Sequence, residues 1–373
     1  MKTDNLPGIY IHVPFCEQKC IYCDFFSEPP AGRLKSWKDA LLREARRHAG
    51  FAPLFGSLYI GGGTPSLLPP GIMAGITGEI MDIYKFDDSA EITVEVNPEH
   101  VTRDYAAFLR DAGFNRLSLG VQSFRDEELE FLGRRHGAAD SERALEICME
   151  SGAGNVSIDL IFAVCEQTTS QWEYNLKRAL SFRPDHLSCY QLTVKEGTAL
   201  RELADKGKIS LPREEVQREM YIAASDTLRS AGYSHYEVSS FCLDGRESRH
   251  NRLYWRHLPY LGLGPSAHSF DGSIRWWNGR SLDEYIRDSE SDPAGMEKLS
   301  GAQLDLERIF LGLRTWEGVD LELAAAYSSG EGVIEMLVER GLAEIRDGRL
   351  APTLEGYLYS DSIPLYFTGQ NGY

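Results

Sequence analysis

Short runs of β-branched and apolar residues alternate with longer amphipathic segments through the first two-thirds of the chain. Between the first two runs, Trp37, Leu41 and Ala45 lie four residues apart, which is the spacing of a buried helical stripe. The runs predict strands that begin near Gly8, Ser57, Glu91, Asn115, Asn155 and His186. The segments between and after them predict helices over residues 36–48, 69–84, 102–112, 141–151, 170–181 and 213–230.

Alternating strand and helix units predict an α/β fold with a parallel sheet, because parallel neighbours need crossover connections. This pattern is compatible with an open sheet and with an incomplete barrel, and it does not separate the two. In both arrangements, binding and catalytic groups gather in the loops at the C-terminal ends of the strands. The loops that follow the predicted strands are therefore the candidates for chemistry.

The pattern changes near residues 271–300, where a polar stretch separates these units from a different arrangement. We expect a first domain over residues 1–285 and a second over residues 286–373. The second ends in helical segments and a stretch, VERGLAEIRDGRLAPT, that resembles the last helix and wing of a winged-helix domain. Such domains often bind DNA, but this one has little basic excess. We therefore expect a smaller, mainly helical, winged-helix-like domain that packs or binds a partner.

The charge balance argues against nucleic acid as a partner. The 373 residues include 39 Lys and Arg against 56 Asp and Glu, and the net charge of −17 repels a phosphate backbone. The sequence shows neither a bilayer-length apolar stretch nor a signal peptide. We expect a cytoplasmic protein without an integral membrane segment, whose association with a membrane, if any, is peripheral and made through partners. In that compartment, seven cysteines indicate ligation or burial and not a disulfide framework.

Three of the cysteines, Cys16, Cys20 and Cys23, follow the first predicted strand with the spacing Cys-x3-Cys-x2-Cys. Three thiolates on one short loop can hold three corners of a [4Fe–4S] cubane and leave the fourth iron open. The amino and carboxylate groups of S-adenosylmethionine can supply the missing ligands, and electron transfer can then cleave the sulfonium to a 5′-deoxyadenosyl radical. Tyr22 lies where it could contact the adenine.

Two simpler interpretations are incidental thiols and a zinc site with His12 as the fourth ligand. Structural zinc sites usually combine one Cys-x2-Cys pair with a distant second pair. The remaining cysteines do not form a pair of that spacing, and we expect them to be buried apolar thiols: Cys148, Cys165, Cys189 and Cys242. The spacing therefore favours the iron–sulfur cluster.

Polar groups follow the next strands in turn. The second strand leads into GGGTPS at residues 61–66, whose glycines let backbone groups approach a ligand or simply make a tight turn. Glu95 ends the third strand, Gln122 follows the fourth with Arg134 twelve residues on, and Asp159 lies in the fifth. A buried Asp needs a partner, which a ligand or Arg134 could supply. Singly each group could stabilise the fold; together, one per strand end, they predict a cofactor cleft.

Taken in order, these motifs resemble the radical S-adenosylmethionine superfamily, in the group of oxygen-independent coproporphyrinogen III dehydrogenase and the HemW haem chaperones. The resemblance rests on YIHVPFCEQKCIYCDF, YIGGGTPSLL, VEVNPE, RLSLGVQSF, LGRRH, SIDLIF, HNRLYW and YLGLGPSAHS. It implies a partial (β/α)6 barrel with a smaller C-terminal domain, and a cluster on Cys16, Cys20 and Cys23. By motif position it implies S-adenosylmethionine contacts from Tyr10, Gly62, Gly63, Thr64, Glu95, Gln122, Arg134 and Asp159.

Departures from the dehydrogenase pattern favour the haem chaperones. The dehydrogenases resemble Cys-x3-Cys-x2-Cys-x-Cys with a longer N-terminal arm, whereas Phe25 stands here at the place of the fourth cysteine. The HNRLYW block is likewise a HemW-type feature. A different departure follows Asp159, where the family usually shows Gly-Leu-Pro-Gly-Gln-Thr and residues 163–168 read Ala-Val-Cys-Glu-Gln-Thr. The loss of two glycines and a proline must change the backbone preferences of that turn, with a thiol placed near the cleft.

The HNRLYW block at residues 250–255 is the predicted haem site, with His250 as the axial ligand because imidazole binds haem iron well. Aromatic faces could cover the porphyrin, and its propionates could pair with Arg249, Arg252 or Arg256. The second choices for the ligand are His257 and His268. The alternative is a structural motif that docks the C-terminal domain onto the barrel.

The resemblance implies a protein that binds haem and transfers it to respiratory haem proteins, with an electron donor for its cluster. The alternative is a dehydrogenase that oxidatively decarboxylates coproporphyrinogen III by radical hydrogen abstraction in porphyrin biosynthesis. A zinc-stabilised domain without either activity is the third hypothesis.

Overall fold

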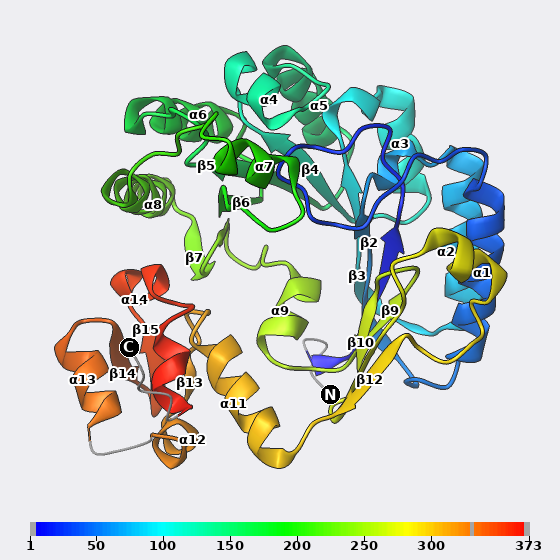
Figure 1. Ribbon diagram of the computed structural model, residues 1–373. Helices are drawn as coiled ribbons and strands as arrows, with labels where there is room; N and C mark the ends of the chain where they lie inside the picture. Colours follow the sequence, from blue (N-terminus) through cyan, green and yellow to red (C-terminus); the bar gives the residue numbers. More distant parts are fainter. Residues whose placement is uncertain (1–4, 329–331, 369–373) are drawn as a thin grey trace.

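The computed structural model describes residues 5–328 and 332–368. The main feature of this part of the chain is a curved 12-stranded sheet in the order β12-β11-β10-β9-β1-β2-β3-β4-β5-β6-β8-β7. Strands β1 to β6 run parallel, helices cover the convex face, and the concave face is turned toward α9 (Figure 1). The predicted α/β class with a parallel sheet is confirmed.

All six predicted strands are present: β1 (Gly8–Val13), β2 (Phe55–Gly62), β3 (Phe86–Val96), β4 (Arg116–Gln122), β5 (Asn155–Phe162) and β6 (His186–Gln191). Strand β3 begins earlier than the predicted start at Glu91, because Phe86 already pairs with Phe55 of β2. The remaining strands of the sheet are short: β7 (Ser234–Glu237), β8 (Ser240–Cys242), β9 (Tyr260–Leu263), β10 (His268–Phe270), β11 (Ile274–Trp277) and β12 (Gly295–Lys298).

The predicted helices correspond to α1 (Leu34–Arg47), α2 (Pro70–Ile83), α3 (Arg103–Asp111), α5 (Ala138–Glu150), α6 (Thr169–Phe182) and α8 (Glu214–Ser230). The hydroxyls of Thr102 and Thr168 cap α3 and α6 by accepting backbone N–H bonds. Elements too short to show a period in the sequence lie between them: η2 (Pro65–Leu67), η3 (Pro98–His100), α4 (Asp126–Leu132), α7 (Ala199–Asp205), α9 (Arg249–Trp255) and α10 (Leu282–Arg287). Within the described ranges, no helix has the length and apolar character needed to cross a bilayer.

The parallel strands carry apolar side chains on one face and polar side chains on the other. On β5, Val156, Ile158 and Leu160 belong to the main hydrophobic core with the outer helices. The residues between them include Ser157 and Asp159, which lie on the concave side. Most parallel sheets are apolar on both faces because helices cover both. Here the core lies between the sheet and the outer helices, so the concave face is left for polar groups.

The sheet is curved but does not close, so the structure has the incomplete barrel, one of the two arrangements that the sequence pattern left open. Beyond β6 the sheet continues with the antiparallel strands β8 and β7, and beyond β1 it continues with β9. The edge at β7 is covered by the C-terminal region, where the Val238 N–H donates to the Arg314 carbonyl (2.9 Å) and the Trp316 N–H to the Tyr236 carbonyl (3.1 Å). The architecture is the partial barrel that the resemblance implied.

The C-terminal region has its own small core, which includes Ile309, Leu337 and Leu350. A three-stranded sheet in the order β13 (Val319–Asp320), β15 (Arg349–Pro352), β14 (Ala343–Arg346) packs with α11 (Gly301–Gly312), α12 (Leu321–Ala326), α13 (Val333–Glu339), α14 (Leu354–Leu358) and η4 (Ile363–Phe367). The hairpin turns through Asp347 and Gly348, both at positive φ. The region is therefore mainly helical with a wing, as predicted, while the boundary between residues 285 and 286 stays a prediction.

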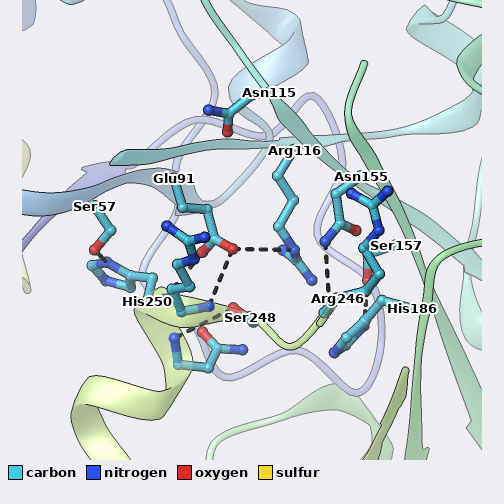
Figure 2. A network of polar contacts seen from close by, with 12 residues as sticks. Ser57, Glu91, Asn115, Arg116, Asn155, Ser157, His186, Arg246, Ser248 and His250 are labelled. Carbon is cyan, nitrogen blue, oxygen red and sulfur yellow. Dashed lines mark hydrogen bonds and ion pairs between the residues drawn. The ribbon is translucent and has the colours of Figure 1, made fainter. Parts of the chain in front are cut away.

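A buried polar network attaches the start of α9 to strands β2, β3 and β4 (Figure 2). Glu91 of β3 accepts hydrogen bonds from the backbone N–H groups of Arg249 (3.1 Å) and His250 (3.0 Å). Its carboxylate also lies 4.0 Å from Nε of the fully buried Arg116. Burial by itself would lower the pKa of Arg116, but the attraction of Glu91 raises it, so the charge is kept. Helix α9 is thereby held across the concave face.

Candidate functional site

A cavity of about 1010 Å³ opens at the C-terminal ends of the strands, at the upper end of the usual size of small-molecule sites. Its wall combines the loop after β1, the ends of β2 to β6, α9 and part of the C-terminal region. Ten of the twelve predicted site residues lie on this wall in the described structure: Cys16, Cys20, Cys23, Gly62, Gly63, Thr64, Glu95, Gln122, Arg134 and Asp159. Tyr10 and His250 lie behind it.

The loop that carries the three cysteines is closed at its base. The Cys16 N–H donates to the Glu28 carbonyl (3.1 Å), and the Glu28 N–H donates to the Pro14 carbonyl (2.8 Å). At the tip, the Cys23 N–H donates to the Cys20 carbonyl (3.2 Å), which makes a tight turn between these two ligand positions. The backbone therefore holds all three half-buried thiols toward one cavity.

The surroundings of the thiols suit a [4Fe–4S] cluster. The Thr64 hydroxyl lies 3.2 Å from Cys16 Sγ, and Nη1 of Arg134 donates to Cys20 Sγ at 3.5 Å. Burial raises the pKa of Cys23 to about 11, and a bound metal centre would offset this effect by stabilising the thiolate. Hydrogen bonds to the sulfur atoms are a usual means of tuning such a centre. The donor set and the cavity therefore fit the group that the motif implies.

The end of β4 and the segment after α4 supply a strained residue, Gln122, and a cation, Arg134, to the wall. Nη2 of Arg134 donates to Asn97 Oδ1 (2.9 Å) and to the Gly120 carbonyl (3.1 Å), while its buried Nε has no hydrogen-bond partner among the described residues. Gln122 has φ +65°, a conformation that costs a non-glycine residue energy and is common at binding sites. An unpartnered buried donor and a strained backbone on one wall indicate a place for a ligand.

The glycines after β2 are required by the packing of the protein itself. A Cβ on Gly63 would lie 2.6 Å from the Phe15 carbonyl oxygen and 2.8 Å from that of Val13. A Cβ on Gly62, whose φ is +110°, would lie 2.5 Å from the ring of His12. These glycines therefore let the loop lie directly against the cysteine loop, and the close approach of a ligand is not needed to explain them.

Two half-buried carboxylates line the cavity from β3 and β5. Glu95 accepts hydrogen bonds from the Tyr59 hydroxyl (2.8 Å) and the Gly62 N–H (3.0 Å). Burial raises the pKa of Glu95 to about 7, and repulsion from Asp159 contributes to the shift. Burial also raises the pKa of Asp159, whose nearest hydroxyls include that of Ser118 (3.5 Å). An ammonium or a ribose would offset this loss of hydration, which fits the groups of S-adenosylmethionine.

Tyr10 and His12 form a pair behind the wall. His12 Nε2 lies 2.8 Å from the Phe26 carbonyl oxygen, and Nδ1 lies 3.1 Å from the Tyr10 hydroxyl. Burial lowers the pKa of His12 to about 4, so the ring is neutral. With both ring nitrogens engaged, the geometry does not support the zinc interpretation, in which His12 was the fourth ligand. It also ties the Tyr10 hydroxyl to the protein, so its predicted cofactor contact stays a prediction.

His250 is a second buried histidine with two partners. Nδ1 lies 2.8 Å from the Ser57 hydroxyl, and Nε2 lies 2.9 Å from the hydroxyl of Tyr254, which does line the cavity. Burial lowers the pKa of His250 to about 3. Iron could bind this ring only after one nitrogen leaves its partner. The contacts are those of a structural anchor for α9, and haem ligation by His250 stays a prediction.

The other residues predicted to hold haem also have protein partners. Glu317 binds both Arg252 (2.8 Å) and Arg256 (2.6 Å), and Arg249 donates to the Ser89 carbonyl (2.8 Å). Of the two second-choice histidines, His257 lies 2.8 Å from Glu307, and His268 is stacked on Trp277. Within the described residues, all five lie outside the cavity wall. The pairing of Arg249, Arg252 or Arg256 with haem propionates stays a prediction.

The turn after β5 keeps a left-handed backbone without glycine. Ala163 has φ +59° and Glu166 has φ +58°, and both stand where the family pattern has glycine. The turn is closed by the Gln167 N–H, which donates to the Val164 carbonyl (2.9 Å). The altered sequence therefore leaves strain in this turn. Cys165 is not part of the described cavity wall, so the expected thiol beside the cleft is not seen.

We expect Glu166→Gly to raise the free energy of unfolding by about 0.5 to 1 kcal/mol, because glycine relieves the positive φ at a smaller entropic cost. Urea unfolding followed by circular dichroism measures the change. The control is Glu173→Gly in the middle of α6, which should lower stability by about 1 kcal/mol. Equal losses in both variants would mean that Glu166 is not strained.

The wall also contains residues that the sequence analysis did not select: Tyr190, Gln191, Glu237, Arg314, Tyr357 and Asp361. They come from β6, the last residue of β7 and the C-terminal region. Alternation along β6 could have identified Tyr190, because Ser188 and Tyr190 share a face. Arg314 and Tyr357 carry no local signal, since only the packing of the C-terminal region against β7 brings them to the cavity.

Comparisons with known proteins agree with this architecture. The sequence model of the "Radical SAM superfamily" matches residues 10–179, and that of the "HemN C-terminal domain" matches residues 299–359. The chain is 33% identical to the "Heme chaperone HemW" of Mycobacterium tuberculosis (strain ATCC 25618 / H37Rv), over 95% of this chain and 93% of that protein. It is 32% identical to the "Heme chaperone HemW" of Bacillus subtilis (strain 168), over 98% and 100%. The solved coproporphyrinogen III oxidase (HemN) from Escherichia coli superposes with a TM-score of 0.84 at 24% identity, over 98% of this chain and 91% of that one.

Proposed function

Because this chain belongs to the radical S-adenosylmethionine superfamily, in the group that includes HemW and coproporphyrinogen III oxidase, we propose that it binds haem and transfers it to haem proteins. The observation that carries the proposal is the similarity to proteins named haem chaperones along nearly the whole chain. Membership of the superfamily also implies a [4Fe–4S] cluster and S-adenosylmethionine. The roles of individual residues are part of the proposal.

The cluster would be held by Cys16, Cys20 and Cys23, which line one cavity with Arg134 and Thr64 beside their sulfur atoms. When bound, it would supply electrons one at a time, received from an electron donor. The half-buried carboxylates of Glu95 on β3 and Asp159 on β5 would accept hydrogen bonds from the ammonium and ribose of S-adenosylmethionine. The other proposed contacts to that cofactor are Tyr10, Gly62, Gly63, Thr64, Gln122 and Arg134.

Haem would occupy the part of the same cavity that α9 and the C-terminal region enclose. His250 remains the proposed axial ligand, through Nε2, after the Tyr254 hydroxyl moves away from it. The recipients would be respiratory haem proteins, reached from the cytoplasm, with peripheral contact to the membrane through these partners. An acidic surface is compatible with protein recipients and argues against nucleic acid.

The second candidate is oxidative decarboxylation of coproporphyrinogen III. The superposition on coproporphyrinogen III oxidase supports the shared fold, and the cavity is of a size for a tetrapyrrole. Phe25 stands where the dehydrogenase pattern has a fourth cysteine, and its side chain is 59% exposed at the cavity. This position favours the chaperone.

The test is a haemin titration of the anaerobically reconstituted protein, followed by transfer to an apo-haem protein. Wild type should bind haem stoichiometrically, and His250→Ala should weaken the complex and change its absorption bands. The matched control is His186→Ala, because His186 is equally buried between two hydroxyls, those of Ser157 (2.8 Å) and Tyr236 (2.8 Å) (Figure 2). The control should keep the wild-type haem spectrum.

Each outcome bears on a different part of the proposal. Identical spectra in both variants would remove His250 as the ligand and leave haem binding intact. Absence of specific haem binding by wild type would reject the chaperone. Conversion of coproporphyrinogen III to protoporphyrinogen by the reconstituted protein would establish the second candidate in its place.

A further inference from the structure

Arg314 stands where the C-terminal region joins the large sheet. Its carbonyl oxygen accepts the Val238 N–H (2.9 Å), and the next residue, Thr315, forms a β-bridge with Glu237. The main chain at Arg314 and Thr315 is therefore held against the end of β7 and the residue that follows it. The side chain is 27% exposed and lines the cavity. The C-terminal region thus contributes a cation of fixed position to the cavity wall, which it shares with residues of the parallel strands.

The contacts of this guanidinium favour an exchange of partners. It lies over the ring of Trp255 in α9, with 5.5 Å between its central carbon and the ring centroid. It also pairs with Asp361, whose side chain is 90% exposed. An ion pair with so exposed a carboxylate contributes little to stability, whereas stacking on an aromatic face keeps the guanidinium in place. A ligand carboxylate could therefore replace Asp361 without moving Arg314.

The hydroxyl of Tyr357 is a second polar group on this part of the wall. Tyr357 is 6% exposed, and its hydroxyl has no hydrogen-bond partner among the described residues. Its ring packs against that of His235, with centroids 4.9 Å apart. Burial raises the pKa of Tyr357, so the hydroxyl stays a neutral donor. A buried donor left without an acceptor is costly, which points to an acceptor on a bound molecule.

The other cations of the wall belong to the cysteine end of the cavity. Arg134 bonds to Cys20 and to Asn97, Lys195 pairs with Asp24 (2.9 Å), and Lys19 lies within the cysteine loop itself. Figure 1 shows the C-terminal region on the side of the concave face away from that loop. Arg314 is therefore placed to hold a negative group at the end of the cavity remote from the cluster.

Resting on the proposed function, we propose that Arg314 binds a propionate carboxylate of haem, with Trp255 supporting the guanidinium and the Tyr357 hydroxyl as a further donor. Binding exchanges the exposed Asp361 for the propionate. A planar guanidinium matches a carboxylate with two parallel N–H bonds, and such charge-assisted bonds are stronger than those between neutral groups. The C-terminal region thereby takes part in recognising the ligand.

The test compares haemin with haemin dimethyl ester, which has the same ring and iron but no carboxylate charge. Arg314→Gln should weaken haemin binding about tenfold and leave binding of the dimethyl ester unchanged. Asp361→Asn should bind haemin more tightly, because the competing carboxylate is gone. The matched control is Arg218→Gln, which removes another ion pair to the C-terminal region, with Glu355, outside the described cavity wall. It should bind both haemins as wild type does.

Circular dichroism and thermal melts of Arg314→Gln against Arg218→Gln show whether the fold is kept. If Arg314→Gln weakens both haemins equally, or neither, Arg314 does not read a propionate and the inference is wrong while haem binding stands. If wild type binds neither haemin, the proposed function fails and the inference with it.

Discussion

Replacing any one of Cys16, Cys20 and Cys23 with alanine is expected to abolish assembly of a stable [4Fe–4S] cluster. Each thiolate would hold a separate corner of the cubane, and the residues beside the loop sulfurs are a hydroxyl, Thr64, and a guanidinium, Arg134. The further thiol on the described cavity wall, Cys189, is buried on β6 and lies outside the cysteine loop. Iron and sulfide analysis after anaerobic reconstitution should fall from nearly four of each per chain toward zero. Loss of the charge-transfer absorption of the cluster should accompany it.

The matched control for the cysteine variants is Cys165→Ala, because Cys165 is also a half-buried thiol but lies outside the described cavity wall. It should assemble the cluster as wild type does. A full complement of iron in any one of the three loop variants would contradict the assignment of that cysteine. Zinc in place of iron in the wild-type protein purified without oxygen would revive the zinc interpretation.

Replacing Glu91 with alanine is expected to lower the free energy of unfolding by about 3 to 5 kcal/mol. The change leaves the fully buried Arg116 without its closest carboxylate and removes the acceptor of two backbone N–H groups at the start of α9. Urea unfolding measures the loss. Because α9 carries Tyr254 and Trp255 to the cavity, the same variant should also weaken haem binding.

Two further variants separate this effect from a general loss of charge. Glu79→Ala removes an exposed pair with Arg46 and should cost at most about 1 kcal/mol. The double variant Glu91→Ala, Arg116→Met removes both buried charges and should recover a large part of the stability. A double variant no more stable than Glu91→Ala would show that the unpaired arginine is not the cause.

The buried His250 shows how a local sequence can indicate a segment of interest without deciding the role of its histidine. HNRLYW is a compact cluster of an imidazole, aromatic rings and arginines, which is why the sequence indicates a haem site there. In the folded chain the imidazole lies between Ser57 and Tyr254, and two of the arginines bind Glu317. Ser57 lies 193 residues from His250 in the sequence, and Glu317 lies 65 residues from Arg252, so no local pattern predicts these two contacts.

The glycine motif after the second strand could be recognised in the sequence, but the physical reason for its glycines could not. Its presence after the second strand was readable, and so was the turn it makes. The reason for Gly63 is the carbonyl oxygen of Phe15, 2.6 Å from where a Cβ would stand, on a loop nearly fifty residues earlier. Glycine is required at position 63 because the Phe15 carbonyl oxygen occupies the place of a Cβ, and that contact is made only in the tertiary structure.

The sequence by itself determined the six parallel strands, their helices, the cysteine loop and the polar residue at each strand end. These features depend on side-chain period and on spacing within a few residues, and parallel strands necessarily bring their C-terminal ends together. Only the tertiary structure decided that the sheet stays open and that His250 lies behind the cavity wall. It also decided that Arg314 and Tyr357 complete that wall. Those outcomes depend on which distant segments pack against β7 and on which buried polar groups find partners, and no local pattern encodes either.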